Sequence, residues 1–317
     1  MSQTIALSVG IDISKDRLDV AVHPGGDGRS FANDKTGLRQ LVAWLAKLTP
    51  RLIVFEATGP YHRDLEQGLA NAALAFAKVN PRQARRFAEA TGKLAKTDRA
   101  DALMLARFAA LMEPQVRPMR SPALEQLAEL VAARRLLTRD RTAMKNRAQI
   151  LRIDLLKRQA CERLKQIAAQ IDAIDAMARD IVDNDPALAR RFAILVSIPG
   201  LGPTTAFALL ADMPELGQMD QRQAAALAGL APITRQSGKW HGKAAIRGGR
   251  RHLRQAIYMP ALVAARFNPQ LRATFDRLVA KGKPAKVAIT AVMRKIVVLA
   301  NALIRDDRTW TNAKISA

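Results

Sequence analysis

Cysteine is nearly absent from the 317-residue sequence, which has only Cys161. A single thiol excludes an intrachain disulfide and a cysteine-rich zinc cluster. Aromatic residues make up 4% of the chain, so recognition of single strands on a broad aromatic platform is not expected. The four histidines lack the spacing of an HExxH-type zinc motif. We therefore expect neither a zinc site nor a stacking surface.

Features of exported and membrane proteins are also lacking. Residues 1–16 carry charges and show no signal-peptide pattern. The most apolar late segment, 287–304, is interrupted by Arg294 and Lys295, so it does not read as a membrane span. We therefore expect a cytoplasmic protein that does not enter the membrane.

Basic residues are present in large excess. Lys and Arg total 51 against 28 Asp and Glu, a formal net charge of +23. Such an imbalance indicates a polyanionic partner, and nucleic acid is the first candidate. The apolar fraction of 49% is that of a folded protein, and the length allows two domains, or one domain with a helical insertion.

The N-terminal part alternates strands with helices. Short β-branched runs at 5–13 and 18–22, with a third at 30–32, predict a meander of strands. The pattern then predicts a helix at 37–48, a strand at 51–57, a helix at 60–73 and a strand at 74–79. This alternation indicates an α/β layer architecture. Its order, completed by a last helix, is that of the ribonuclease-H-like fold.

Four acids fall where such a sheet places functional residues. Asp12 and Glu56 end two predicted strands, while Asp98 and Asp101 begin the helix 98–112 on one face. Carboxylates gathered in a basic chain predict a divalent-metal site for phosphoryl chemistry. Taken alone, the pair Asp98 and Asp101 has a more ordinary interpretation, an acidic first turn stabilised by the helix dipole. The set of four is more specific than any one acid.

The middle of the chain, from Ser121 to about Asp185, predicts two long helices. Apolar residues keep a 4-3 spacing over 160–181, the pattern of a coiled-coil seam. We expect a dimerising stalk that also touches nucleic acid. Its candidate nucleic-acid contacts are Arg134, Arg135, Arg139, Arg141 and Lys145.

The remainder reads as helical with one basic loop. Residues 195–206 have the form of a helix-hairpin-helix, which binds phosphate through backbone N–H groups, although a simple interhelical turn fits equally well. Between Arg235 and Arg254 there are seven Lys or Arg and no acid. Ser237 in this loop is a candidate nucleophile, or a turn serine that binds phosphate passively. The candidate nucleic-acid contacts here are Gly200, Gly202, Lys239, Lys243, Arg250, Arg251 and Arg254.

Motifs along nearly the whole chain resemble the DEDD transposases of bacterial insertion sequences, the group described as bridge-RNA-guided recombinases. They are residues 9–15, 55–59, 96–102, 198–202 and 229–232, followed by Ser237-Gly238 and 252–254. The stretch 247–250 is richer in arginine than the family pattern.

The resemblance implies a RuvC-like, ribonuclease-H-like α/β domain (1–118), a helical coiled-coil connection (119–185) and an all-helical C-terminal transposase domain (186–317). It places Mg²⁺ on the four acids and assigns attack on DNA to Ser237. It also implies a structured guide RNA and a homo-oligomer, a dimer or a tetramer. Because Ser237 lacks a nearby carboxylate and the acids lack a nucleophile, we expect them to form one active site.

Other functions stay open at this point. The same metal site with Ser237 in a structural role gives a junction-resolving endonuclease that uses activated water. Residues 10–12 also resemble the opening of actin-like sugar kinases, but the sequence has no later Gly-rich Asp motif to hold ATP. A non-enzymatic nucleic-acid scaffold would make the acids accidental.

Overall fold

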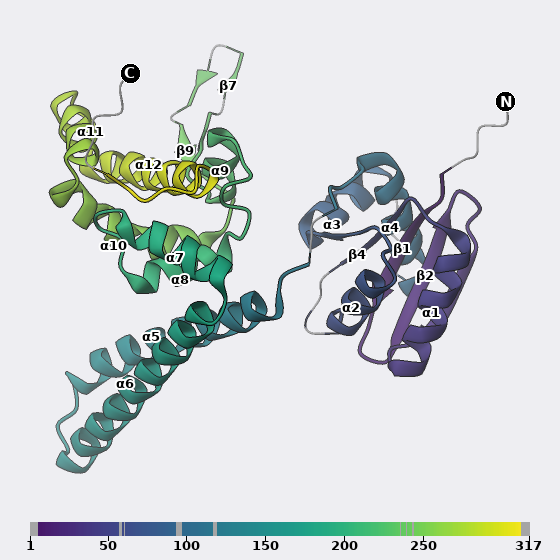
Figure 1. Ribbon diagram of the computed structural model, residues 1–317, viewed down its shortest axis with the longest axis horizontal. Coiled ribbons are helices and arrows are strands. Elements are labelled where there is room, and N and C mark those ends of the chain that lie inside the picture. The colour runs from purple at the N-terminus through teal and green to yellow at the C-terminus, as the bar shows by residue number, and fades with distance from the viewer. Residues whose placement is uncertain are drawn as a thin grey trace. The chain divides into compact units, whose positions relative to one another are not determined.

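The computed structural model describes residues 6–56, 59, 61–92, 97–116, 119–234, 236–238, 240–242 and 244–311, without the side chains of Trp240 and His241. The chain divides into two compact units, Met1–Met119 and Arg120–Ala317, which are treated separately (Figure 1). The predicted contacts Lys239 and Lys243 lie outside the described residues. The three-domain division stays a prediction.

A five-stranded mixed sheet forms the centre of the N-terminal unit. Its strands are β1 (Ser8–Ile13), β2 (Arg17–His23), β3 (Gly28–Ala32), β4 (Leu52–Glu56) and β5 (Phe76–Val79), in the order β3-β2-β1-β4-β5. The first three strands run antiparallel, and β4 and β5 continue the sheet parallel to β1. The predicted meander and the strand–helix alternation are therefore confirmed.

Helices cover both faces of this sheet (Figure 1). They are α1 (Lys35–Leu48), α2 (Arg63–Asn71), α3 (Pro81–Ala90) and α4 (Asp98–Met112); α3 was not predicted as a separate helix. Side chains alternate along a strand, so Ile11 and Phe55 join the core under α1 and α2. Val54 of β4 and Leu105 of α4 belong to the core on the other face of the sheet.

The C-terminal unit begins with a long antiparallel helical hairpin. It consists of α5 (Pro122–Ala148) and α6 (Asp154–Asp183), which pack along each other (Figure 1). The predicted seam faces α5 of the same chain, where Ile167 and Ile171 are buried. The 4-3 pattern is thus satisfied within one chain, because the period does not specify which chain supplies the partner helix.

The rest of this unit is a helical core. Its helices are α7 (Pro186–Ser197), α8 (Pro203–Asp212), α9 (Gln221–Leu227), α10 (Arg251–Phe267), α11 (Pro269–Ala280) and α12 (Ala285–Arg305). Every residue of α8 from Thr205 to Ala211 is buried. Helix α12 is long and apolar enough to cross a membrane, but half of its most apolar window is buried inside the protein, so it is a core helix of this unit.

The C-terminal part was predicted to be all-helical, but its described residues also include four two-residue strands. Strand β6 (Pro232–Ile233) pairs with β9 (Ala245–Ile246), and β7 (Gln236–Ser237) pairs with β8 (Trp240–His241). We call residues 232–246 the serine finger, and its described strands project from the helices of this unit (Figure 1). The sequence predicted a loop here because strands this short show no period.

Candidate functional site

Gly10 sets the distance between β1 and α4. A Cβ atom at this position would collide with the Ala102 carbonyl oxygen and the Ala106 amide nitrogen, both in the backbone of α4. Only glycine therefore lets the helix lie directly against the strand. Asp12, two residues further on the same face of β1, consequently lies close to the first turn of α4.

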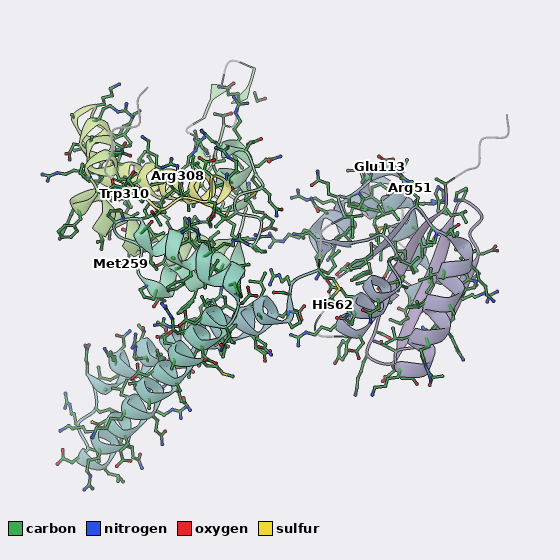
Figure 2. All side chains as sticks on the ribbon, viewed as in Figure 1. Arg51, His62, Glu113, Met259, Arg308 and Trp310 are labelled. Carbon is green, nitrogen blue, oxygen red and sulfur yellow. The ribbon has the colours of Figure 1, made fainter. Side chains whose placement is uncertain are left out.

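The two ends of α4 are held by different contacts. Thr97 caps the helix, since its side-chain oxygen accepts a hydrogen bond from the Ala100 amide at 3.2 Å. At the other end, Arg51 Nη1 lies 2.8 Å from Glu113 Oε1, and both side chains are labelled in Figure 2. The cap therefore orders the acidic first turn, and the ion pair joins the end of the helix to the residue that precedes β4.

Asp12, Asp98 and Asp101, which we call the acidic cluster, interact electrostatically. The pKa of Asp12 is raised to about 6, mainly because burial penalises the charged carboxylate. The negative charges of Asp101 and Asp98 raise it further, while a hydrogen bond to the Ile13 backbone opposes the shift. Burial and nearby negative charges make the ionised form of Asp12 unfavourable, and a cation beside the carboxylate would relieve this.

Glu56 lies on the same side of the sheet as Asp12. Ile11 of β1 is paired with Phe55 of β4, and both side chains point into the core under α1 and α2. The next residues along these parallel strands, Asp12 and Glu56, therefore share the opposite face, which α4 covers. Glu56 is half-buried at the end of its strand. The structure thus brings the four predicted acids to one edge of the sheet.

The donor set fits a hard divalent cation, because carboxylate oxygens are the ligands that Mg²⁺ takes in proteins. Among the described residues, however, no three His, Cys, Asp or Glu side chains lie close enough together to hold a metal ion as they stand. Asp98 instead accepts a hydrogen bond from Arg17 Nη2 at 2.8 Å. Metal binding by all the acids therefore requires a rearrangement of side chains.

Ser237 is exposed near the far end of the serine finger. It is the last residue of β7 and pairs with Trp240, and Gly238 makes the turn between them with a φ of 56°. A hydroxyl on such a hairpin is open to a large substrate such as a DNA strand. This placement suits a nucleophile, and it equally suits passive contact with phosphate.

Two of the predicted nucleic-acid contacts fix the base of the finger instead of pointing free. Arg250 donates to both carboxylate oxygens of Glu215, at 2.7 and 2.6 Å. Arg254 donates to the carbonyl oxygens of Gly229 and Gly248, at 3.1 and 2.9 Å. Arg251 is exposed at the start of α10. A role in nucleic-acid binding stays a prediction for all three, but Arg250 and Arg254 already have protein partners.

The basic residues of α5 divide in the same way. Arg134 forms a two-pronged ion pair with Asp175 of α6, at 2.6 and 2.9 Å, and Arg135 lies 3.5 Å from Asp212. Arg139 and Lys145 are exposed, and Arg141 is partly exposed. The last three are the better candidates for phosphate contacts.

Gly200 and Gly202 have different roles in the predicted helix-hairpin-helix. At Gly200, with a φ of 100°, a Cβ atom would press on Ala264 of α10, so this glycine serves packing. Gly202 caps α8, and no atom lies near its Cβ position. Only the second glycine leaves an open helix N-terminus for phosphate, which stays a prediction.

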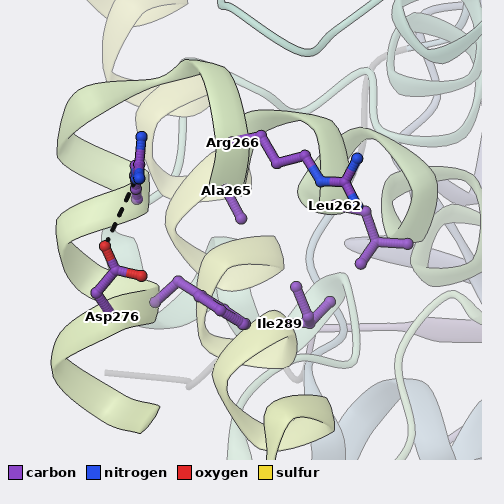
Figure 3. A pocket seen from close by; sticks show the side chains of 7 residues that line it. Leu262, Ala265, Arg266, Asp276 and Ile289 are labelled. Atoms are coloured by element: carbon purple, nitrogen blue, oxygen red, sulfur yellow. Dashed lines mark ion pairs between the residues drawn. The ribbon is translucent and has the colours of Figure 1, made fainter. Parts of the chain in front are cut away.

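A cavity of about 410 Å³ lies between α10, α11 and α12. Leu262 and Ile289 contribute apolar walls, and Arg266 and Asp276 add charge beside them (Figure 3). Arg272 pairs with Asp276 at 3.7 Å. The cavity contains none of the predicted site residues.

Sequence reasoning missed two residues beside the acids. Asp19 is directly opposite Asp12 in the β1–β2 ladder, and Arg17 is two residues earlier on the same face. The only signal for them was that both belong to the strand after the first acidic motif. Their importance depends on the strand register, which the sequence did not specify.

A mixed sheet with acids at the end of β1 and the start of its covering helix is consistent with the ribonuclease-H-like domain of DEDD enzymes. Two family models match the chain. The model of DEDD transposases of the IS110 type matches residues 9–152, and that of the transposase IS116/IS110/IS902 family matches residues 192–276. The chain belongs to the IS110-type family of insertion-sequence transposases and is a DNA transposase or recombinase.

Similar proteins agree with this assignment. The pilin gene-inverting proteins of Moraxella bovis and Moraxella lacunata are each 29% identical over 313 residues, which cover 95% of this chain and 97% of each relative. An uncharacterized 42 kDa protein of insertion element IS900 from Mycobacterium paratuberculosis is 33% identical over 48% of this chain and 40% of its own length. A DEDD-type domain implies a divalent metal ion, and a transposase acts on DNA.

Proposed function

We propose that this protein moves or inverts a DNA segment by cutting and rejoining strands through a transient phosphoserine at Ser237, with Mg²⁺ on the four acids. The observation that carries the proposal is the packing of α4 on Gly10, which gathers Asp98 and Asp101 beside Asp12. The pilin gene-inverting relatives support recombination in place of simple cutting.

The covalent step conserves the energy of the phosphodiester. The Ser237 oxygen forms a bond to phosphorus, its proton passes to a base, and the bond to the leaving sugar oxygen breaks and releases a hydroxyl. Attack by the hydroxyl of another strand reverses these changes and frees the serine. When bound, a divalent ion supplies Lewis-acid stabilisation of the phosphoryl oxygens.

The experiment uses labelled DNA that carries the ends of the element, with Mg²⁺, and stops the reaction by denaturation. A DNA–protein adduct is expected for the natural protein and is lost in Ser237→Ala. Thr234→Ala removes another exposed hydroxyl of the finger and serves as the matched control. Strand cutting that persists without an adduct in Ser237→Ala would support a junction-resolving endonuclease instead.

We also propose that the acids and Ser237 serve one cleavage event in a homo-oligomer. Protomers with Asp98→Ala and protomers with Ser237→Ala are then each inactive alone. Restored adduct formation in a mixture shows that different chains can supply the two parts. Demonstrably mixed assemblies that stay inactive confine both parts to one chain.

A structured RNA is proposed as the guide, on the strength of the family resemblance and the net charge of +23. Purification without nuclease, followed by sequencing of the retained RNA, tests this. A single enriched species encoded beside the gene is expected. Retention of unrelated cellular RNA would mean that the basic surface binds nucleic acid without guidance.

A further inference from the structure

Among the described residues, Arg17 is a cationic group that contacts the acidic cluster. Its Nη2 atom lies 2.8 Å from Asp98 Oδ2, and its Nε atom lies 2.8 Å from Asp19 Oδ2. One guanidinium therefore bridges the sheet and the first turn of α4. A hydrogen-bonded guanidinium matches carboxylates geometrically, and it occupies an oxygen that a metal ion would need.

Asp19 anchors Arg17, and both of its carboxylate oxygens already accept hydrogen bonds. Its Oδ1 atom accepts a hydrogen bond from Ser30 Oγ, and its Oδ2 atom accepts the bond from Arg17. The three side chains of Asp12, Asp19 and Ser30 lie in a row across β1, β2 and β3, because the ladders pair Asp12 with Asp19 and Asp19 with Ser30. Asp19 is 11% exposed, whereas Arg17 is 53% and Asp98 is 58% exposed. The buried end of the bridge is thus fixed and the exposed end is free to exchange.

Electrostatics explains why a cation belongs here. Asp12, Asp19, Asp98 and Asp101 carry like charges at close range, and their repulsion contributes to the raised pKa of Asp12. The two carboxylates of Asp19 and Asp98 raise the pKa of Arg17 in turn. The acids are thereby partly neutralised before a metal ion arrives.

We propose that Arg17 is a positioning residue that competes with the divalent ion for Asp98 and holds this carboxylate until the ion takes it over. The inference rests on the proposed metal role of the acids. Arg17, still anchored on Asp19, is then left with its Nη2 group free beside the site. A guanidinium in that position suits a DNA phosphate.

The test measures binding of Mn²⁺ to the full-length, nucleic-acid-free protein through the electron paramagnetic resonance signal of the free ion. Arg17→Ala is expected to bind Mn²⁺ roughly threefold to tenfold more tightly, because the competitor is gone. Arg17→Lys keeps the positive charge but loses the planar guanidinium, so its Mn²⁺ affinity should fall between those of the natural protein and Arg17→Ala. Arg39→Ala is the matched control, because Arg39 lies on α1, which covers the other face of the sheet.

Competition for Asp98 in particular is isolated by a double-mutant cycle. When Asp98 is already replaced by Asn, the increase in Mn²⁺ affinity caused by Arg17→Ala should shrink by about half or more. The thermal midpoint of metal-free Arg17→Ala should fall and recover on adding Mn²⁺, which shows that the variant folds.

Equal Mn²⁺ affinity in the natural protein, Arg17→Ala and Arg39→Ala would overturn the role of Arg17 while leaving the metal site intact. Weaker binding in Arg17→Ala would likewise overturn it, because Arg17 would then assist the metal site. The absence of saturable Mn²⁺ binding in every variant would overturn the proposed metal function and this inference together.

Discussion

The acidic cluster and the serine finger are built in opposite ways. The acids lie at the end of a buried strand and on the helix packed against it, with no room even for a methyl group at Gly10. Ser237 lies on a two-residue strand whose side chains are exposed, and Arg250 and Arg254 fix the base of its finger.

This difference matches what the two kinds of residue must do. Metal ligands need positions held by surrounding packing, because small displacements change coordination. A nucleophile that attacks a long polymer needs access and reach, which an exposed loop on a rigid support provides. Substitutions in the packing that holds the cluster should therefore act through the fold, whereas substitutions in the finger should act through the chemistry alone.

The largest effect is expected when an acid of the cluster is neutralised. Asp98→Asn and Asp101→Asn should each lower recombination in Mg²⁺ by about 10²-fold or more, because each removes an oxygen ligand and a negative charge. Strand transfer in vitro measures this, with circular dichroism to check the fold. Glu89→Gln, on the exposed face of α3, is the control and should keep full activity.

A smaller effect, on stability, is expected from Gly10→Ala. The added methyl group collides with the backbone of α4 and should cost about 2–3 kcal/mol of stability in the N-terminal unit. Gly202→Ala meets open space in the C-terminal unit and should stay within about 0.5 kcal/mol. Denaturant unfolding compares the two. Equal losses would contradict the tight contact between β1 and α4.

A third effect is the pH dependence of the metal-free protein. The pKa of Asp12 in the folded chain is about 6, above the ordinary value of 3.8. The folded chain therefore binds this proton more tightly than the unfolded chain, so ionisation of Asp12 destabilises the fold above that pKa. Asp12→Asn in EDTA should be more stable than the natural protein near pH 7, by about 2–4 °C in melting temperature. The gap should narrow near pH 5, and a constant gap would contradict the raised pKa.

The smallest effect concerns the basic residues of α5. Replacing Arg139 and Lys145 by Gln should lower the salt dependence of DNA or RNA binding by about 0.7–0.9 in log–log slope for each phosphate that the helix no longer binds. Replacing Arg134 and Arg135 should leave that slope unchanged and lower thermal stability, because both side chains form ion pairs within the chain. The reverse result would mean that the observed ion pairs open when nucleic acid binds.

The positions of the acids in the fold could be predicted from the sequence for a physical reason. Strand and helix periods place Asp12, Glu56 and Asp98 at element ends, and parallel strands bring those ends together. The sequence could not predict Arg17 as their partner, because cross-strand neighbours depend on register. For the same reason it could not separate Arg134, paired with another helix, from the exposed Arg139.

The α5–α6 hairpin is a stiff rod with a natural attachment point for a probe. Helix α5 has 27 residues, which corresponds to a rod of about 40 Å. Because the apolar seam is closed between the two helices, bending would cost packing, so a small tilt at the base is transmitted to the tip. Cys161, the only thiol in the chain, is exposed on α6 within about 12 Å of that tip. A single fluorophore can therefore be attached near the tip of the hairpin without changing any other residue.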